Sequence, residues 1–534
     1  MKKINFTVFL FCLLGFSTYG QVWQWSVEIK SSISQETMQH PRAFLWIPEN
    51  CKKVRGIVFT QHNMIEEGML ENSYFRKIMT EIGFAEIWVT PNISINYDIS
   101  KKEDEVFNDV LKTLADVSGY RELSFAPIVP LGHSALASFP WNFAAFNPER
   151  TLALVSVHGD APQTNLTGSG RPNPDWANRN IDGIPSLFIM GEYEWLEKRI
   201  LPAYNYIEKH PQSVITLFCD AGHGHFDYSE MMVKFAADYI KKAAVLRLPK
   251  IRKDSADFVK MKKINPESGW LMDKWRHDSI AKYKPGSFKD FEGDRKTASW
   301  VFDKKTAEEA ERFYAQARGR INQFIGYKQN GRVLIPEKTH ANYYLDFKPS
   351  ADGITFHVSA FFADSTRVKT VGKHAATPLK IDRICGPIKK LNDTTFQISF
   401  YRMGLNSPRR SNDIWLLAHN QGDKNYKSIV QQSELKFPLV NKEGRTQEIN
   451  FAPISDVRQH SGSIELKASS SAAVPVGLYV KEGPAYLDGT TLHFTKIPLK
   501  AKFPVKVTVT AWQYGIAGEL QSAAAVERSF YITK

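Results

Sequence analysis

Residues 126–137 read APIVPLGHSALA, an apolar run that leads through Gly132-His133-Ser134-Ala135 into a helical stretch. A sharp turn between a strand and a helix forces strained backbone angles on Ser134 and lifts its hydroxyl above the sheet. The turn leaves no room for a side chain at Gly132. The amide of Ala135 and the dipole of the following helix can stabilise an oxyanion there. The stretch therefore predicts a nucleophile elbow.

The chain around this elbow, from about residue 22 to 245, alternates short β-branched runs with amphipathic stretches. Such alternation predicts a parallel sheet covered by helices. Strands are expected at residues 54–61, 85–90, 126–131, 152–157, 184–190 and 214–219. Helices are expected at residues 71–82, 104–117, 135–146 and 228–245, with a loop or lid at 163–180.

Taken together, residues 22–245 resemble the α/β-hydrolase family, whose fold is a doubly wound, mostly parallel sheet. The resemblance implies a catalytic serine, acid and histidine in that chain order, with Ser134 as the nucleophile. One position departs from the family's G-x-S-x-G pattern, because Leu136 stands where the last glycine is expected. A leucine there predicts that the following helix is shifted away from the neighbouring strands.

The acid is implied to follow the strand 184–190, which ends in Gly191-Glu192-Tyr193-Glu194. Family members commonly place the acid three residues beyond this glycine, which corresponds to Glu194. Glu192 is a close alternative, and Asp160, after the preceding strand, is a third. Whichever acid acts must hold the imidazole in its productive tautomer and stabilise the imidazolium.

The base is implied to follow the last strand, where the sequence reads Asp220-Ala-Gly-His-Gly-His-Phe-Asp227. The Gly-x-Gly-His pattern before a helix favours His225, and His223 is the alternative. A second oxyanion donor is expected after the strand 54–61. The backbone amide of His62 or Asn63 is the candidate, together with that of Ala135.

The rest of the chain predicts further domains, since 534 residues correspond to about three domains. The expected division is a catalytic domain at 21–247, a basic linker at 248–268, a β-rich accessory domain at 269–445 and an Ig-like β-sandwich at 446–534. Residues 1–20 have a basic start, an apolar core and small residues before Gln21. They predict a cleaved signal peptide and hence a secreted or periplasmic protein.

The cysteine content, the motifs and the net charge limit which cofactors and binding partners the sequence predicts. Cys51, Cys219 and Cys385 are too widely spaced for a disulfide framework, and no zinc-binding, phosphate-binding or dinucleotide-binding motif occurs. We therefore expect no metal and no cofactor. The net charge of +13 is spread along the chain without a nucleic-acid motif, so an acidic polysaccharide is a better candidate partner than nucleic acid.

The combination of a signal peptide, a hydrolase-like segment and a C-terminal sandwich resembles secreted bacterial carbohydrate esterases. That resemblance implies a serine esterase that removes acetyl or methyl esters from plant polysaccharide, with pectin as an acidic example. Two alternatives remain open. One is a glycan-binding or scaffold protein on a degenerate hydrolase fold, which Leu136 favours, and the other is a peptidase.

Overall fold

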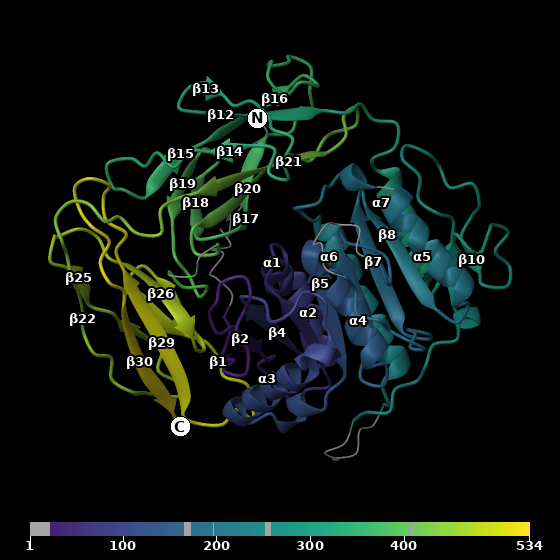
Figure 1. Ribbon diagram of the computed structural model, residues 1–534, viewed down its shortest axis with the longest axis horizontal. Helices are drawn as coiled ribbons and strands as arrows, with labels where there is room; N and C mark the ends of the chain where they lie inside the picture. The colour runs from purple at the N-terminus through teal and green to yellow at the C-terminus, as the bar shows by residue number, and fades with distance from the viewer. Residues whose placement is uncertain (1–21, 165–171, 196, 251–257, 406, 408) are drawn as a thin grey trace, which may run out of the picture.

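The computed structural model describes residues 22–164, 172–195, 197–250, 258–405, 407 and 409–534. The predicted signal peptide lies outside these residues, as do the middle of the predicted lid and part of the predicted linker. Three regions are distinguished in Figure 1: a central α/β unit, a β-rich region above it and a C-terminal β region beside it.

An eight-stranded sheet forms the centre of the α/β unit, in the order β1-β2-β4-β3-β5-β6-β7-β8. The first two strands run antiparallel to their neighbours, and the other six are mutually parallel. The strands are β1 Trp25–Glu28, β2 Arg42–Trp46, β3 Gly56–Gln61, β4 Phe84–Thr90, β5 Ile128–His133, β6 Leu154–Val157, β7 Pro185–Gly191 and β8 Val214–Asp220.

Helices cover both faces of this sheet, which confirms the predicted α/β class. Alternate residues of β7 show the arrangement: Leu187 and Ile189 share a core with α2 and α6, whereas Phe188 and Met190 pack in a core with α4 and α5. The helices are α1 Glu66–Glu71, α2 Ser73–Ile82, α3 Glu103–Ser118, α4 Ser138–Phe146, α5 Glu197–Lys209 and α6 Glu230–Arg247, with short 3₁₀ turns η1 Ile99–Lys101, η2 Arg121–Ser124, η3 Ser134–Leu136 and η4 Glu192–Glu194.

The sequence predicts the six parallel strands to within two residues and misses β1, β2, α1 and α5. Helix α5 contains Pro202, which is disfavoured inside a helix because it lacks a backbone N–H. Its apolar residues nevertheless bury against β7, so tertiary packing outweighs the local preference.

Residues 258–315 pack against the outer edge of the central sheet, so the predicted boundary at residue 269 falls inside a packed unit. The side chain of Ser299 bonds to both the amide and the carbonyl of Leu217 in β8, at 2.8 and 3.1 Å. The hydroxyl of Tyr314 accepts from the amide of Cys219 at 3.2 Å. The backbone N–H and C=O groups of an exposed edge strand need such hydrogen-bond partners. This unit holds η5 Pro266–Ser268, β9 Trp270–Met272, β10 Gly286–Ser287, β11 Ser299–Val301 and α7 Lys304–Ala315.

The β-rich region contains three small sheets around one core, in the orders β13-β12-β16, β14-β21-β20-β17 and β15-β19-β18. Its strands are β12 Phe324–Gln329, β13 Arg332–Val333, β14 Tyr344–Leu345, β15 Thr355–His357, β16 Ser359–Ala363, β17 Lys380–Cys385, β18 Ile388–Asn392, β19 Thr395–Ile398, β20 Asp413–Asn420 and β21 Ile429–Lys436.

The C-terminal region contains two sheets, in the orders β23-β30-β29-β26 and β24-β28-β27, and one strand pair, β22-β25. The inner residues of this region share a core with the α3 side of the central sheet. Its identity as an Ig-like domain stays a prediction. Its strands are β22 Ile449–Phe451, β23 Val457–Arg458, β24 Ser463–Glu465, β25 Ala468–Ser470, β26 Gly477–Glu482, β27 Ala485–Asp488, β28 Thr491–Phe494, β29 Val505–Trp512 and β30 Val526–Thr533.

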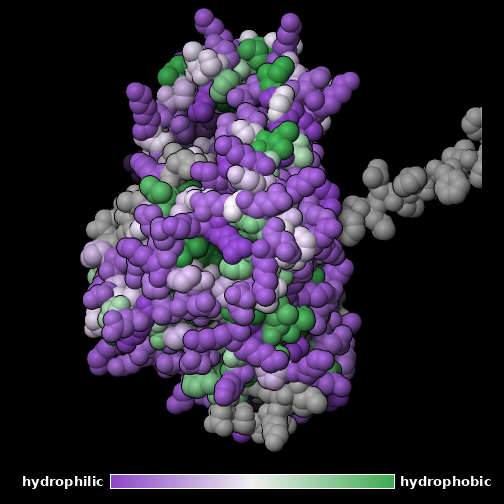
Figure 2. Space-filling view, turned by 90° about the vertical axis from the view of Figure 1, so that its right-hand side faces the viewer, coloured by the Kyte–Doolittle hydropathy of each residue, from purple (hydrophilic) through white to green (hydrophobic). Residues whose placement is uncertain are grey.

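Figure 2 views the molecule from the side of α5 and α7, where hydrophilic residues cover most of the face and hydrophobic residues form small separate groups. Cys51, Cys219 and Cys385 are buried and free. Within the part of the chain that the structure describes, no helix combines the length and the apolar character needed to cross a bilayer.

Candidate active site

The turn after β5 has the strained geometry that the sequence predicts. Ser134 adopts a left-handed backbone with φ of 53°. A Cβ at Gly132 would lie 2.1 Å from the carbonyl oxygen of Leu136, so only glycine fits there. Leu136 is itself buried in the 3₁₀ turn η3, and α4 begins only at Ser138. The chain thus accommodates the leucine by delaying the regular helix.

The loop after β8 brings His225 to this turn. The Nε2 atom of His225 lies 2.6 Å from the Oγ atom of Ser134, within hydrogen-bond distance. On the other side of the ring, Nδ1 is hydrogen-bonded to the carboxylate of Glu194, which follows β7. Three residues that follow β5, β7 and β8 at the same edge of the sheet therefore form one continuous chain of hydrogen bonds.

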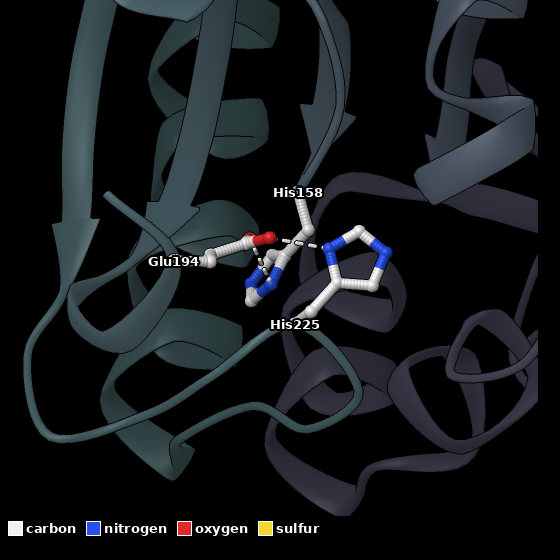
Figure 3. Close-up of side chains that lie close together, drawn as sticks. All are labelled: His158, Glu194 and His225. Carbon is white, nitrogen blue, oxygen red and sulfur yellow. Dashed lines mark hydrogen bonds and ion pairs between the residues drawn. The ribbon is translucent and has the colours of Figure 1, made fainter. Parts of the chain in front are cut away.

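Glu194 is held between two imidazoles. Figure 3 shows its carboxylate between His158 and His225, and the Nδ1 atom of His158 lies 2.8 Å from Oε1. The guanidinium of Arg199 lies 3.4 Å from Oε2. Burial alone would raise the pKa of Glu194, but His225 and His158 outweigh it and hold that pKa far below its ordinary value. The carboxylate is therefore ionised and can stabilise an imidazolium.

His158 was not singled out from the sequence, although it stands in the run VSVHGD after β6. Its side chain is fully buried, and its φ of 54° is left-handed. Burial lowers the pKa of His158, but the charge of Glu194 raises it further and the net direction is upward. The signal in the sequence is its place at a strand end beside the elbow, where polar side chains converge.

His158, Glu194 and His225 also offer ligand atoms that all lie within 4.8 Å of one another. Two imidazoles and a carboxylate are groups that zinc accepts. Each of these imidazoles already lies against the carboxylate with its Nδ1 atom, so ion pairing with Glu194 accounts for the arrangement. That the chain works without a metal or cofactor stays a prediction.

The alternative acids have other partners. Glu192 is buried, accepts a hydrogen bond from the amide of Gly222 at 2.8 Å and forms an ion pair with Lys427 at 3.0 Å. It therefore anchors the histidine loop. The backbone carbonyl of Asp160 accepts from the indole of Trp141 at 3.0 Å, and Asp160 is buried in the protein interior.

The alternative base, His223, pairs with Asp227 in the same loop, with 2.5 Å between Nδ1 and Oδ2. Burial lowers the pKa of His223, but Asp220 and Asp227 outweigh it and raise the value to about 9. Asp227 also accepts from the amide of Gly224 at 2.8 Å. This charged pair fixes the shape of the loop that delivers His225.

The backbone amides of both candidates for the second oxyanion donor already have acceptors within the protein. The amide of His62 donates to the carbonyl of Val89 at 2.7 Å, and that of Asn63 donates to Glu66 at 3.1 Å. Glu66 follows three residues after Asn63 and gathers the amides of Asn63, Met64 and His133. Its complete burial raises its pKa to about 7. The amide of Ala135 lies in the first turn of η3, where backbone N–H groups have no partner within the helix.

His133, inside the elbow itself, ties the histidine loop to the sheet. Its Nε2 atom lies 2.7 Å from the carbonyl oxygen of His225, so the Nε2–H donates to that oxygen. The side-chain amide of Asn63 donates to the Nδ1 atom of the same ring at 3.2 Å. Burial holds the pKa of His133 well below its ordinary value, so the ring is neutral and can accept this bond.

The β-rich region forms a wall of the site, which the sequence did not indicate. Lys427 reaches Glu192, and the backbone carbonyl of Ser428 accepts from the hydroxyl of Tyr193. Trp415 stacks on Phe226, with 5.0 Å between ring centroids. The guanidinium of Arg410 donates to the backbone carbonyl of Asn63 at 2.9 Å. The predicted accessory domain therefore contacts the elbow side and the histidine side of the site.

A cavity of about 530 Å³ opens beside the elbow, with Ala135 and Leu136 in its wall. The other lining residues are mostly polar: Gln35, Glu36, Asn63, Asn92, Ile93, Ser94, Ile95, Asn96, Asp98, Lys101, Glu103, Pro172, Asn173, Pro174, Arg409 and Arg410. Its volume falls within the range of about 300–1,000 Å³ that is common for small-molecule sites.

A scan against protein-family models finds no match, and a search of curated proteins finds none either. Several solved structures of esterases are similar to part of the chain. An esterase of Pyrobaculum calidifontis is 16% identical, with 42% of this chain and 87% of that chain covered and a TM-score of 0.30. A truncated carbohydrate esterase from gut microbiota is 13% identical, with 42% and 98% covered and a TM-score of 0.30.

An S-formylglutathione hydrolase from Staphylococcus aureus is 14% identical, with 41% of this chain and 96% of that chain covered and a TM-score of 0.28. TM-scores this low carry no argument about activity. The fold class is assigned from features of this structure. These are a mostly parallel sheet with helices on both faces, a strained serine turn after β5, and an acid and a histidine after β7 and β8. This is the architecture of an α/β-hydrolase domain.

Proposed function

We propose that the chain is a serine hydrolase that cleaves carboxylic esters, with Ser134 as nucleophile, His225 as general base and Glu194 as the orienting acid. The observation that carries the proposal is the 2.6 Å contact between Ser134 Oγ and His225 Nε2, with Glu194 on the opposite ring nitrogen. Nucleophile, base and orienting group in hydrogen-bond reach of one another are the signature of an activated serine.

In the proposed reaction, Ser134 Oγ attacks the ester carbonyl carbon while its proton moves to His225 Nε2. The carbonyl oxygen takes the negative charge and faces the amide of Ala135. When the C–O bond breaks, the leaving alkoxide takes the proton from His225. A water molecule then attacks the acyl-serine, gives a proton to His225 and releases the acid, and Ser134 regains its proton.

The finer proposal is that the ester belongs to a plant polysaccharide outside the cytoplasm, as an acetyl or a methyl ester. A polar cavity beside the elbow and a net charge of +13 support a hydrophilic substrate, including an acidic chain such as pectin. The β-rich wall supports an enzyme in which the accessory region shapes the site.

Hydrolysis of 4-nitrophenyl acetate by the wild type and by Ser134→Ala tests the reaction class. We expect the substitution to lower kcat by about 10³-fold or more. Equal rates in both proteins would remove the hydrolase proposal and leave the glycan-binding alternative. Release of acetate from acetylated xylan, methanol from pectin, or neither, then separates the ester types.

A further inference from the structure

The cavity beside the elbow contains a buried acceptor without a partner. Asn96 lines this cavity and is only 8% exposed. Its Oδ1 atom is buried and has no hydrogen-bond partner among the described residues. A buried acceptor left unpaired costs about 1–3 kcal/mol, so a ligand that donates a hydrogen bond there would gain that energy.

The orientation of the Asn96 side chain is fixed by its surroundings. Its Nδ2 atom donates to the carbonyl of Pro172 at 3.1 Å, so the amide nitrogen is identified and Oδ1 is left as the acceptor. The backbone carbonyl of Asn96 accepts from Asn142 at 2.6 Å, and Asn142 accepts from the indole of Trp176 at 2.7 Å. These hydrogen bonds fix the position of Asn96 in the cavity wall.

The charges of the cavity are largely matched within the protein. Arg410 pairs with Glu36 at 2.5 Å, and Lys101 pairs with Asp98 at 3.3 Å. The wall also contains four asparagines, Asn63, Asn92, Asn96 and Asn173, between its apolar residues. A fatty acyl chain would leave these polar groups without partners. A ring that carries several hydroxyl groups can donate to and accept from them.

We propose that this cavity binds the sugar residue that bears the ester, and that Asn96 is a specificity residue whose Oδ1 accepts a hydrogen bond from a sugar hydroxyl. The inference rests on the proposed function, because the sugar must lie next to the Ala135 amide for its ester to reach Ser134. Recognition through a hydroxyl gives strong preference over ligands that lack it.

The test compares 4-nitrophenyl acetate, which has no sugar, with an acetylated xylo-oligosaccharide and a methyl-esterified oligogalacturonide. For Asn96→Ala we expect kcat/KM on the better sugar ester to fall about tenfold, mainly through KM, as expected for one lost hydrogen bond. Hydrolysis of 4-nitrophenyl acetate should stay within about twofold of wild type. Asn450→Ala, at an exposed position of β22, is the matched control and should change neither.

Two results would overturn the inference: an equal loss on both kinds of substrate, which indicates a structural role, or no loss on either. If Asn96→Ala does not fold, the free oligosaccharide should inhibit the wild type competitively with 4-nitrophenyl acetate as substrate. Absence of inhibition would also overturn it. Failure of the proposed function is distinct, because Ser134→Ala would then keep the activity of the wild type.

Discussion

The buried ion pair between Lys427 and Glu192 connects the β-rich region to the loop of the acid, and replacing Lys427 with Met tests that connection. The two charges lie 3.0 Å apart, with side chains 1% and 2% exposed. Removal of one partner from such a pair costs about 3–5 kcal/mol, because it leaves the other charge buried. Glu192 keeps the amide of Gly222 and a contact with His277 at 3.3 Å, so we expect a loss of about 3 kcal/mol.

The free energy of unfolding in urea measures this loss, with kcat measured on 4-nitrophenyl acetate alongside. Because Glu192 also holds the histidine loop, we expect kcat to fall by about tenfold. The double variant Glu192→Gln/Lys427→Met has no buried charge and should recover most of the stability.

The exposed pair of Lys348 and Asp346, at 3.2 Å, provides the matched control, and Lys348→Met should cost less than about 1 kcal/mol. A result for Lys427→Met as small as that of the control would refute the argument that this contact joins the two regions.

Three further predictions concern the elbow, the acid and the histidine loop. Gly132→Ala should lower the free energy of unfolding by about 1–3 kcal/mol and abolish activity, because its Cβ would lie 2.1 Å from a carbonyl oxygen; unchanged activity would contradict the elbow geometry. Glu194→Gln should lower kcat by about 10⁴-fold with little change in KM, because His225 loses its ionised partner. An unchanged kcat would show that another residue acts as the acid. The pKa of His223 is raised from 6.5 to about 9, so protonation of this residue stabilises the folded protein by at most about 3 kcal/mol; the gain is complete below pH 6.5 and is lost as the pH rises through 9. Asp227→Asn should flatten this pH dependence of the free energy of unfolding, measured in urea titrations. Parallel curves for both proteins would refute the prediction.

The α/β-hydrolase domain was predictable because its local signals agree with its global fold. Each parallel strand is a short apolar run, and the side chains at the strand ends fall at one edge of the sheet. That rule alone brings Ser134, Glu194 and His225 together, although almost a hundred residues separate the first from the last. The antiparallel strands β1 and β2 lack this βα alternation and were missed.

The two candidate amides of the oxyanion loop are engaged by one tertiary and one local contact, since that of His62 donates to the carbonyl of Val89 and that of Asn63 to Glu66. The stretch Gln61-His62-Asn63 indicates a loop at the correct strand end, but the amide of Asn63 is taken by Glu66. A glutamate three residues after a loop residue is a signal of this kind, since it can accept nearby amides. That Glu66 would be completely buried could not be read from the sequence, which places it in a polar Glu-Glu pair.

The contribution of the β-rich region to the site was equally hidden. Lys427, Arg410 and Trp415 lie about two hundred or more residues beyond the groups they contact, and each looks like an ordinary strand or loop residue. Their roles follow from how the β-rich region docks on the sheet, which no local pattern encodes. His158 was missed for a related reason, since its partner Glu194 lies on the next strand.

Covalent labelling with a fluorophosphonate, followed by mass spectrometry of the peptides, tests the central claim most directly. A serine activated by a neighbouring imidazole attacks such a probe, whereas ordinary surface serines do not. We predict a single adduct on Ser134 in the wild type, strongly slowed labelling in His225→Gln and none in Ser134→Ala. A folded wild type that takes up no probe, or that carries the adduct on another residue, would contradict the account.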